Sequence, residues 1–280
     1  MGTLFVVATP IGNLEDVSLR ALRLLGSVGL IAAEDTRTAR ILLSHHGIKG
    51  RLISYNDHNK TRRIPEILDA LAAGDVALVT DAGTPAISDP GVELAAAARE
   101  AGYAVVAVPG PSAVVAALSV AGLPATRFSF VGFLPRGRGD LRRLIETYLA
   151  RPEALVAFES PRRLRASLGV IAEVMPERRL AVCRELTKLH EEVFVGTAAE
   201  ALDHFSQPRG EIVLVIEGAG EAEAAKGEDG AEEETLRREV SEMRRLGLTR
   251  SQATALLASR YGVSRRRGYE LWLASEESSA

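Results

Sequence analysis

The stretch "DVALVTDAGTPAISDPG", residues 75–91, runs along a short strand and then turns at once into a loop. Residues 75–80 are mostly apolar and predict a buried strand. Residues 81–91 are rich in Asp, Gly, Thr, Pro and Ser, the residue types that form turns. Such a loop is either an ordinary connection to the next helix or the wall of a site at the tip of the strand.

The chain around this stretch alternates strands and helices. The predicted strands are 3–8, 30–33, 51–55, 75–80 and 103–109, and the predicted helices are 15–27, 36–47, 61–73, 91–101 and 112–121. Asp16 or Ser18 would cap the first helix. This alternation predicts a mostly parallel sheet covered by helices on both faces. We assign residues 1–123 to this N-terminal α/β domain.

A second α/β domain is predicted over residues 124–218. Its strands are expected at 127–134, 154–160, 179–186, 191–198 and 210–218, and its helices at 138–150, 161–174 and 199–205. Two of these strands follow each other with no helix between them, which indicates an antiparallel or mixed sheet. The fold class is therefore α/β, with two consecutive α/β domains and a small C-terminal helical tail.

The C-terminal part of the chain has a different texture. Residues 219–234 are acidic and rich in Ala and Gly, which predicts a flexible linker. Residues 235–280 predict a helical tail of about three helices. Its predicted breaks are Gly247 and Gly262, and its predicted N-caps are Thr249 and Ser264.

The net charge of −3 is unevenly distributed. Residues 221–234 carry seven acids and one lysine, and the remaining chain has 33 basic and 30 acidic residues. Most of the basic residues are arginines, which bind phosphate bidentately. Either phosphate binding or the base composition of the genome would explain this excess, so the charge alone leaves a nucleic-acid partner open.

The composition predicts a cytoplasmic protein without disulfides. The chain has one cysteine, Cys183, which excludes an intrachain disulfide and fits a reducing compartment. The N-terminus lacks the features of a signal peptide. Residues 103–126 carry no charge and are long enough to span a bilayer. Because Pro109, Gly110 and Pro111 interrupt this run, we expect a strand, a turn and a helix, and no membrane partner.

Polar loops follow all five strands of the predicted parallel sheet. They are "TPIGN" (9–13), "AEDTR" (33–37), "SYNDHN" (54–59), "TDAGTPAISDPG" (80–91) and "PGPSA" (109–113). In an open parallel sheet, ligands bind outside the carboxyl ends of the strands, so these loops predict a site. The chain has no dinucleotide-binding or P-loop glycine motif. Its five histidines have no zinc spacing, and no metal site is predicted.

These loops, together with later segments, resemble a known family. "ATPIGNLED", "AEDTR", "SYNDHN", "VTDAGTPAISDPG", "PGPSA", "GFLPR", "FESPRRL" and "RELTKLHEE" run in order across residues 3–218 and are similar to the S-adenosylmethionine-dependent methyltransferases of the tetrapyrrole-methylase fold. Within them the chain resembles the ribosomal RNA small subunit methyltransferase I branch. That branch methylates the ribose 2′-oxygen of a cytidine in the decoding region of 16S rRNA. The resemblance implies 16S rRNA or the 30S subunit as partner, and a homodimer.

The resemblance also implies where the methyl donor, S-adenosylmethionine, would bind: in a cleft between the two α/β domains. Gly83 would let the backbone approach the donor closely. Asp81 would accept hydrogen bonds from it, and the helix that starts at Ser112 would offer unpaired N–H groups. Asp81 and Ser112 could instead cap helices, and Asp89 is expected to be a cap. The implied donor residues are Pro10, Asp81, Ala82, Gly83, Thr84, Pro85, Ser112, Ala113, Phe158, Leu186 and Gly210.

Methyl transfer to a ribose oxygen needs in-line placement and help with loss of the hydroxyl proton. Candidates for that help are Glu34, Asp35 and His58, with Asp57 beside them. Glu34 and Asp35 could equally hold Arg37 in a structural pair, and His58 could be an ordinary surface group. The residues expected to contact RNA are Asn13, Arg37, Asn56, Asn59, Lys60, Arg136 and Arg266.

Two other functions remain open. One is a methyltransferase of the same fold for a small tetrapyrrole-like substrate, which would not need the basic loops and tail. The other is a non-catalytic RNA-binding module. The glycine and acid pattern of residues 80–91 argues against that module, because binding RNA alone would not require it.

Overall fold

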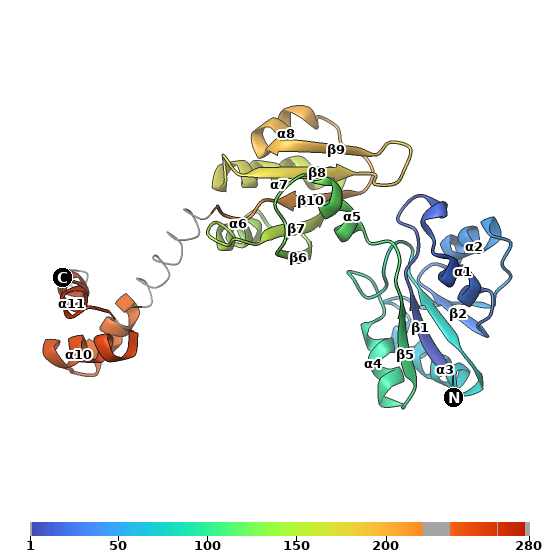
Figure 1. Ribbon diagram of the computed structural model, residues 1–280, viewed down its shortest axis with the longest axis horizontal. Coiled ribbons are helices and arrows are strands. Elements are labelled where there is room, and N and C mark those ends of the chain that lie inside the picture. The colour runs from blue at the N-terminus through green and yellow to red at the C-terminus, as the bar shows by residue number, and fades with distance from the viewer. Residues whose placement is uncertain (1, 221–235, 262, 278–280) are drawn as a thin grey trace. The chain divides into compact units, whose positions relative to one another are not determined.

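The computed structural model describes residues 2–220, 236–261 and 263–277. Its first sheet has the strand order β3-β2-β4-β1-β5, and every neighbouring pair is parallel. Figure 1 shows these strands with their connecting helices. The predicted parallel sheet is confirmed. The strands are β1 (Thr3–Val7), β2 (Leu30–Ala33), β3 (Leu52–Ser54), β4 (Val76–Val79) and β5 (Ala104–Val108).

Helices cover both faces of the first sheet. On β4, Ala77 and Val79 belong to a core with α1 (Leu19–Leu25) and α2 (Thr36–His45). Val76 and Leu78 point to the other face and pack with α3 (Lys60–Ala73) and α4 (Val92–Glu100). Because both faces are covered, the central strands are apolar throughout, as the sequence of β4 shows.

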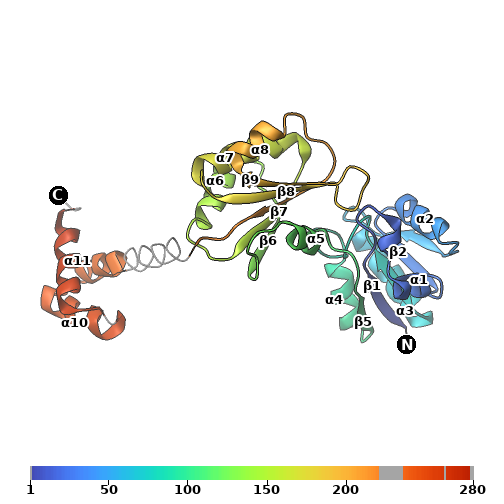
Figure 2. The same cartoon turned by 45° about the horizontal axis from the view of Figure 1, so that its top comes forward.

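The second sheet is mixed, as predicted. Its order is β6-β7-β10-β8-β9, with β6 parallel to β7 and the other pairs antiparallel. Helices α7 and α8 pack against each other beside it (Figure 2). The strands are β6 (Phe128–Phe133), β7 (Ala154–Glu159), β8 (Arg179–Arg184), β9 (Glu192–Thr197) and β10 (Ile212–Ile216), and the helices are α6 (Arg138–Thr147), α7 (Pro161–Val174) and α8 (Ala198–His204).

Residues 103–126 fold as a strand, a turn and a helix. The run forms β5 and then α5 (Ala113–Val120). Among the described residues, no helix combines the length and the apolar character that crossing a membrane would need. Helix α5 packs against β10, where Val114 and Ala117 share a core with Val213. The predicted boundary between residues 123 and 124 stays a prediction.

The C-terminal helices form a compact group with their own core. Residues 236–245 are helical and are followed by α10 (Arg250–Tyr261) and α11 (Arg265–Glu277). Their core contains Val240, Leu257 and Trp272. By contacts, the described residues of 1–146 and 153–217 form one unit, and the described residues of 147–152 and 218–280 form the other.

Both predicted N-caps of these helices and one of the two predicted breaks are present. Thr249 and Ser264 accept backbone hydrogen bonds as N-caps, and Gly247 breaks the helical run with a φ of 75°. The expected break at Gly262 lies outside the described residues, as does the predicted linker from residue 221 onward.

Candidate functional site

A cavity of 340 Å³, called the main cavity below, lies between the loops of the first sheet and the second sheet. The loops after β4 and β5 form one wall, and β7, β10 and the residues that follow β8 form the other. Most of the lining side chains are apolar. The main cavity is lined by Ile11, the segments 82–84, 87–89 and 112–114, Phe133, the segment 158–161, Cys183, Leu186 and the segment 210–213.

The loop after β4 is held firmly by its neighbours. Gly83 and Thr9 exchange two backbone hydrogen bonds of 2.9 and 3.0 Å, and Thr84 Oγ1 donates to the carbonyl of Pro111. Gly83 has a φ of 78°, a conformation that only glycine adopts without strain. The loops after β1, β4 and β5 are therefore tied together as one rigid wall at the carboxyl edge of the sheet.

The opposite wall rests on a buried ionic network. Phe158 packs edge to face against Phe130 at 4.9 Å. The next residue, Glu159, is buried and accepts hydrogen bonds from Arg163 Nε (2.8 Å), the backbone N–H of Ser160 and the hydroxyl of Ser167. A buried carboxylate is tolerated because each oxygen is paired. This network fixes β7 to the first turns of α7.

Eight of the eleven predicted donor residues line the main cavity. Pro10 and Asp81 line a neighbouring cavity of 220 Å³ instead, and Pro85 is buried within its loop. Ser112 occupies the N-cap position of α5, but its side chain makes no capping bond. The donor-binding roles of all eleven stay predictions. The eight are Ala82, Gly83, Thr84, Ser112, Ala113, Phe158, Leu186 and Gly210.

The predicted catalytic residues lie in a different place, called the acidic pocket below. This pocket has a volume of 450 Å³ and is lined by the segments 34–37 and 56–58 and by Ser54. Asp35 accepts hydrogen bonds from the backbone N–H (2.7 Å) and Nε (3.0 Å) of Arg37, and these bonds lower the pKa of Asp35 to about 2. Asp35 therefore forms the structural pair with Arg37 that the sequence left open, and it is a weak proton acceptor.

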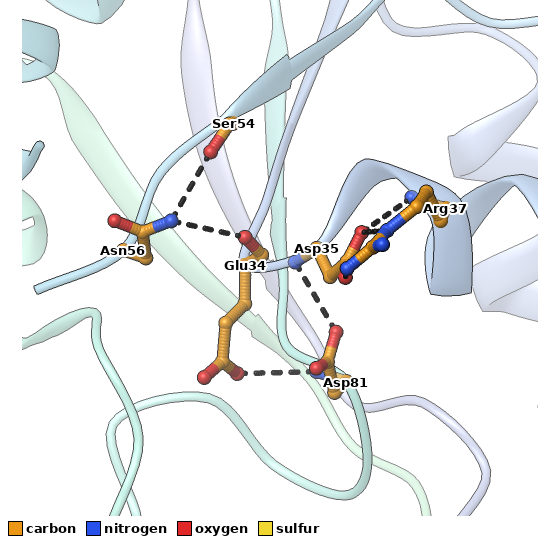
Figure 3. Close-up of polar contacts among 6 residues, drawn as sticks. All are labelled: Glu34, Asp35, Arg37, Ser54, Asn56 and Asp81. Atoms are coloured by element: carbon orange, nitrogen blue, oxygen red, sulfur yellow. Dashed lines mark hydrogen bonds and ion pairs between the residues drawn. The ribbon is translucent and has the colours of Figure 1, made fainter. Parts of the chain in front are cut away.

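Glu34 and Asp81 link the loops after β2 and β4 (Figure 3). Glu34 Oε2 accepts from the backbone N–H of Asp81 at 3.3 Å, and Asp81 Oδ1 accepts from the backbone N–H of Asp35 at 3.2 Å. Burial raises the pKa of both Glu34 and Asp81 above the ordinary values. These two carboxylates therefore hold the two loops together through hydrogen bonds, and they also place negative charge there.

Several predicted RNA contacts are engaged within the protein. Asn56 and Asn59 both donate to Ser54 Oγ, at 3.2 and 3.0 Å, and so hold the loop after β3. Lys60 forms ion pairs with Glu93 and Asp57. Asn56 lines the acidic pocket, and Asn59 and Lys60 contact residues that line it, Ser54 and Asp57.

The other predicted RNA contacts differ in their exposure to solvent and in their partners within the protein. Asn13 caps a short 3-10 helix (Leu14–Asp16) through its side chain. The side chain of Arg37 is 86% exposed despite its pairing, and Arg266 is 90% exposed beside Glu270. Arg136 is exposed. The RNA-binding roles of all these residues stay predictions.

Asp89 is the residue that the sequence interpretation placed wrongly. It was expected to cap the helix after its loop, but Gly91 is the N-cap of α4 and the helix has no side-chain capping bond. Asp89 lines the main cavity instead. The signal was available, because "ISDPG" belongs to the same loop as Gly83, but Asp followed by Pro-Gly is also typical of a helix start.

Among the described residues, no group of three or more His, Cys, Asp and Glu side chains could hold a metal ion. Cys183 is buried in the wall of the main cavity, and burial raises the pKa of its thiol to about 11. It is therefore a neutral thiol at physiological pH and serves as an apolar wall residue.

Comparison with known proteins identifies the family. Residues 3–202 match the family model described as tetrapyrrole (corrin/porphyrin) methylases. The chain belongs to this family. A curated member from Synechocystis, named "Ribosomal RNA small subunit methyltransferase I", is 44% identical over 280 residues, which covers 99% of each chain. A member of the same name from Thermotoga maritima is 48% identical and covers 78% of this chain and 99% of its own length.

A solved structure of another methyltransferase has the same fold. It is uroporphyrin-III C-methyltransferase from Thermus thermophilus in complex with S-adenosylhomocysteine. Its TM-score is 0.55 at 19% identity, and the match covers 77% of this chain and 97% of that one. The two consecutive α/β sheets of this chain are therefore the fold of the family.

Proposed function

We propose that this chain is an S-adenosylmethionine-dependent methyltransferase that acts on the ribose 2′-oxygen of a cytidine in the decoding region of 16S rRNA. The observation that carries the proposal is the main cavity, built from the loops after β1, β4 and β5 and from the second sheet, in a chain that is 44% identical over its full length to a protein named for small-subunit rRNA methylation. The family supplies the reaction class, and the identity supplies the substrate.

The main cavity suits a methyl donor of this kind. Its 340 Å³ falls within the roughly 300–1,000 Å³ of small-molecule sites. Ile11, Phe158 and Leu186 provide apolar surface for a purine ring. The unpaired backbone N–H groups at the start of α5, beside Ser112 and Ala113, suit a carboxylate.

The protein's part in the reaction is positioning. The bound donor supplies a methyl group that is already activated on a sulfonium ion. The rigid wall formed by the loops after β1, β4 and β5 would fix the donor, so that the ribose oxygen can be held in line with it, an effect that contributes several kcal/mol when the geometry is right. The apolar lining of the main cavity would exclude water from the donor.

Exposed arginines support an RNA substrate rather than a small one. Arg37 lies at the acidic pocket, and Arg136 follows the end of β6. Residues 236–277 contain nine arginines against five acidic residues. Within them, the guanidinium of Arg250 stacks on Tyr269 at 4.9 Å. Such cations would contact phosphates and add to affinity without reading sequence.

The test is transfer of a tritiated methyl group from S-adenosylmethionine to 30S subunits, followed by nucleotide analysis of the 16S rRNA. We expect the label in 2′-O-methylcytidine, which resists alkaline hydrolysis. Free 16S rRNA and a tetrapyrrole are assayed in parallel. Label in the tetrapyrrole alone would favour the small-substrate function, and tight RNA binding without transfer would favour the non-catalytic module.

We also propose that the protein works in the cytoplasm as a homodimer. The cytoplasm is where ribosomal subunits are found, and the single buried Cys183 is compatible with it. Family resemblance is the support for the dimer. Light scattering during size-exclusion chromatography tests this: a mass near the 29.9 kDa of one chain would refute the dimer.

A further inference from the structure

Asp89 lines the main cavity, and its carboxylate makes no hydrogen bond or ion pair that would give it a structural role. The side chain is half-buried and lines the cavity, and no described residue forms a hydrogen bond or ion pair with it. It does not cap α4, because the N-cap there is Gly91. A half-buried carboxylate with no partner costs folding free energy, so its presence at a cavity wall points to use by a ligand.

The other ionisable groups that line the main cavity are committed. Glu159 is paired on both oxygens with Arg163 and Ser167. Glu211 forms an ion pair with Lys188 at 2.9 Å. Cys183 is a neutral thiol, because burial raises its pKa. Asp89 is therefore the acid of this cavity that is free to take a proton.

The protein holds Asp89 in place with a strained backbone. Ala86 and Ser88 have φ angles of 71° and 64°, in the left-handed region that is unfavourable for a residue with a side chain. Gly91 packs so closely that a Cβ there would lie 3.1 Å from Leu78. Strain of this kind persists when the surrounding structure enforces it, and it is concentrated at functional sites.

The surroundings of Asp89 raise its pKa toward neutral pH. Burial, and then the negative charges of Glu34 and Asp81, raise the pKa of Asp89 to about 6. Glu34 belongs to the loop after β2, and Asp81 stands at the start of the loop that contains Asp89; both act on Asp89 through their negative charge. A proton acceptor is most effective when its pKa lies close to the working pH. By contrast, hydrogen bonds from Arg37 lower the pKa of Asp35 to about 2, which makes it a poor acceptor.

We propose that Asp89 is the catalytic residue that accepts the proton of the ribose hydroxyl during methyl transfer. The hydroxyl oxygen forms a bond to the methyl carbon while the carbon–sulfur bond breaks, and that electron pair leaves on sulfur as a neutral thioether. The hydroxyl proton passes to the Asp89 carboxylate and then to solvent. This assignment rests on the proposed function and replaces Glu34, Asp35 and His58 as the proton acceptor.

The test compares Asp89→Asn with the wild-type full chain in the 30S assay. Asn keeps the shape but cannot accept the proton, so kcat should fall by about 100-fold or more, while KM for 30S subunits stays within about threefold. The wild-type kcat should rise with pH to a plateau above an apparent pKa near 6, and the variant should lack that limb. Glu100→Gln, which removes an exposed carboxylate at the end of α4, is the matched control and should behave as wild type.

Two further measurements do not depend on turnover. Calorimetry should give Asp89→Asn the wild-type affinity for S-adenosylmethionine and for S-adenosylhomocysteine. Carbon NMR of labelled aspartates should show one carboxyl that titrates near pH 6 in the wild type and is missing in the variant.

Three results would overturn the assignment. One is an unchanged kcat in Asp89→Asn, and another is a carboxyl that titrates at its ordinary value. The third is a loss of affinity for the charged donor but not for its neutral product, which would assign Asp89 to sulfonium recognition. Failure of the wild-type protein to methylate 30S subunits would refute the proposed function itself, whereas an active Asp89→Asn in an active wild-type background refutes the role of Asp89 alone.

Discussion

The main cavity and the acidic pocket both adjoin the loop region at the carboxyl edge of the first sheet, yet their chemistry differs. In the acidic pocket, Asp35 is paired with Arg37, and Glu34 holds the backbone of Asp81. In the main cavity, most walls are apolar, and Asp89 has no partner among the described residues. The charged residues that cluster in the sequence therefore hold loops together, whereas the single carboxylate in the apolar wall is available for chemistry.

Filling the main cavity should have the largest effect. Ala113 is the first residue of α5 and lines the cavity, so Ala113→Trp would place an indole in the donor's space. We expect affinity for S-adenosylhomocysteine, measured by calorimetry, to fall by about 100-fold or more, which is about 2.7 kcal/mol. RNA affinity, which we assign to the acidic pocket and the tail, should not change.

The matched control for that variant lies two residues further along the same helix. Val115 is 60% exposed, so Val115→Trp adds the same side chain outside the cavity. It should bind the donor product as the wild type does. Equal affinity for S-adenosylhomocysteine in both variants would show that the donor binds elsewhere. The main cavity would then not differ from the acidic pocket in the way proposed.

Removing the tail should have the next largest effect, this time on RNA. Deletion of residues 235–280 removes a group of helices that has its own core and most of its charge as arginine. We expect the KM for 30S subunits to rise about 10-fold through lost phosphate contacts, with donor affinity unchanged. Methylation as efficient as that of the full chain would show that the loops at the sheet edge bind RNA without the tail.

The sequence predicted the fold well because the signals for it are local. The strand predicted at 75–80 and the helix predicted at 61–73 each depend on residues close together in the sequence, and the structure has them at Val76–Val79 and Lys60–Ala73. The parallel order of the first sheet then places all five polar loops on one edge. Eight donor residues fall on one cavity because the family motifs that carry them are local as well.

The sequence could not predict which polar residues line the main cavity and which are paired within the protein, because this depends on contacts between distant segments. Nothing near residue 89 in the sequence shows that this residue lines the same cavity as Phe158 and Leu186. Nor does the sequence show that Gly91, rather than Asp89, is the N-cap of α4. Such facts follow from backbone angles at Ala86 and Ser88 that no pattern of residue types predicts.

A smaller effect tests the cost of leaving Asp89 unpaired. The pKa of Asp89 in the folded protein is raised from 3.8 to about 6, so its protonated form favours folding. That contribution is complete below the unfolded value and is lost as the pH rises through about 6. Asp89→Asn should therefore be more stable than wild type by about 1 kcal/mol at about pH 8, after allowing for solvent screening, and equally stable at about pH 3.

Urea denaturation at the two pH values measures this difference. Glu100→Gln, whose carboxylate is exposed, should show no pH-dependent gain. A stability difference for Asp89→Asn that is the same at both pH values would mean that the carboxyl is not held in a desolvated site. The proton-acceptor role would then lose its electrostatic support, and the two regions would differ less than the structure indicates.

The smallest expected effect concerns Arg37 in the acidic pocket. Its ion pair with Asp35 is largely exposed, so Arg37→Ala should cost little stability. If the guanidinium contacts one phosphate, RNA affinity should fall about threefold and the slope of log affinity against log salt should become shallower by about one. Arg99→Ala removes an exposed arginine from the last turn of α4, before β5 and so at the opposite edge of the sheet, and is the control. Filter binding at several salt concentrations separates the two. Equal losses of RNA affinity in both variants would mean that RNA affinity depends only on the net charge of the protein. Arg37 would then be a purely structural partner of Asp35.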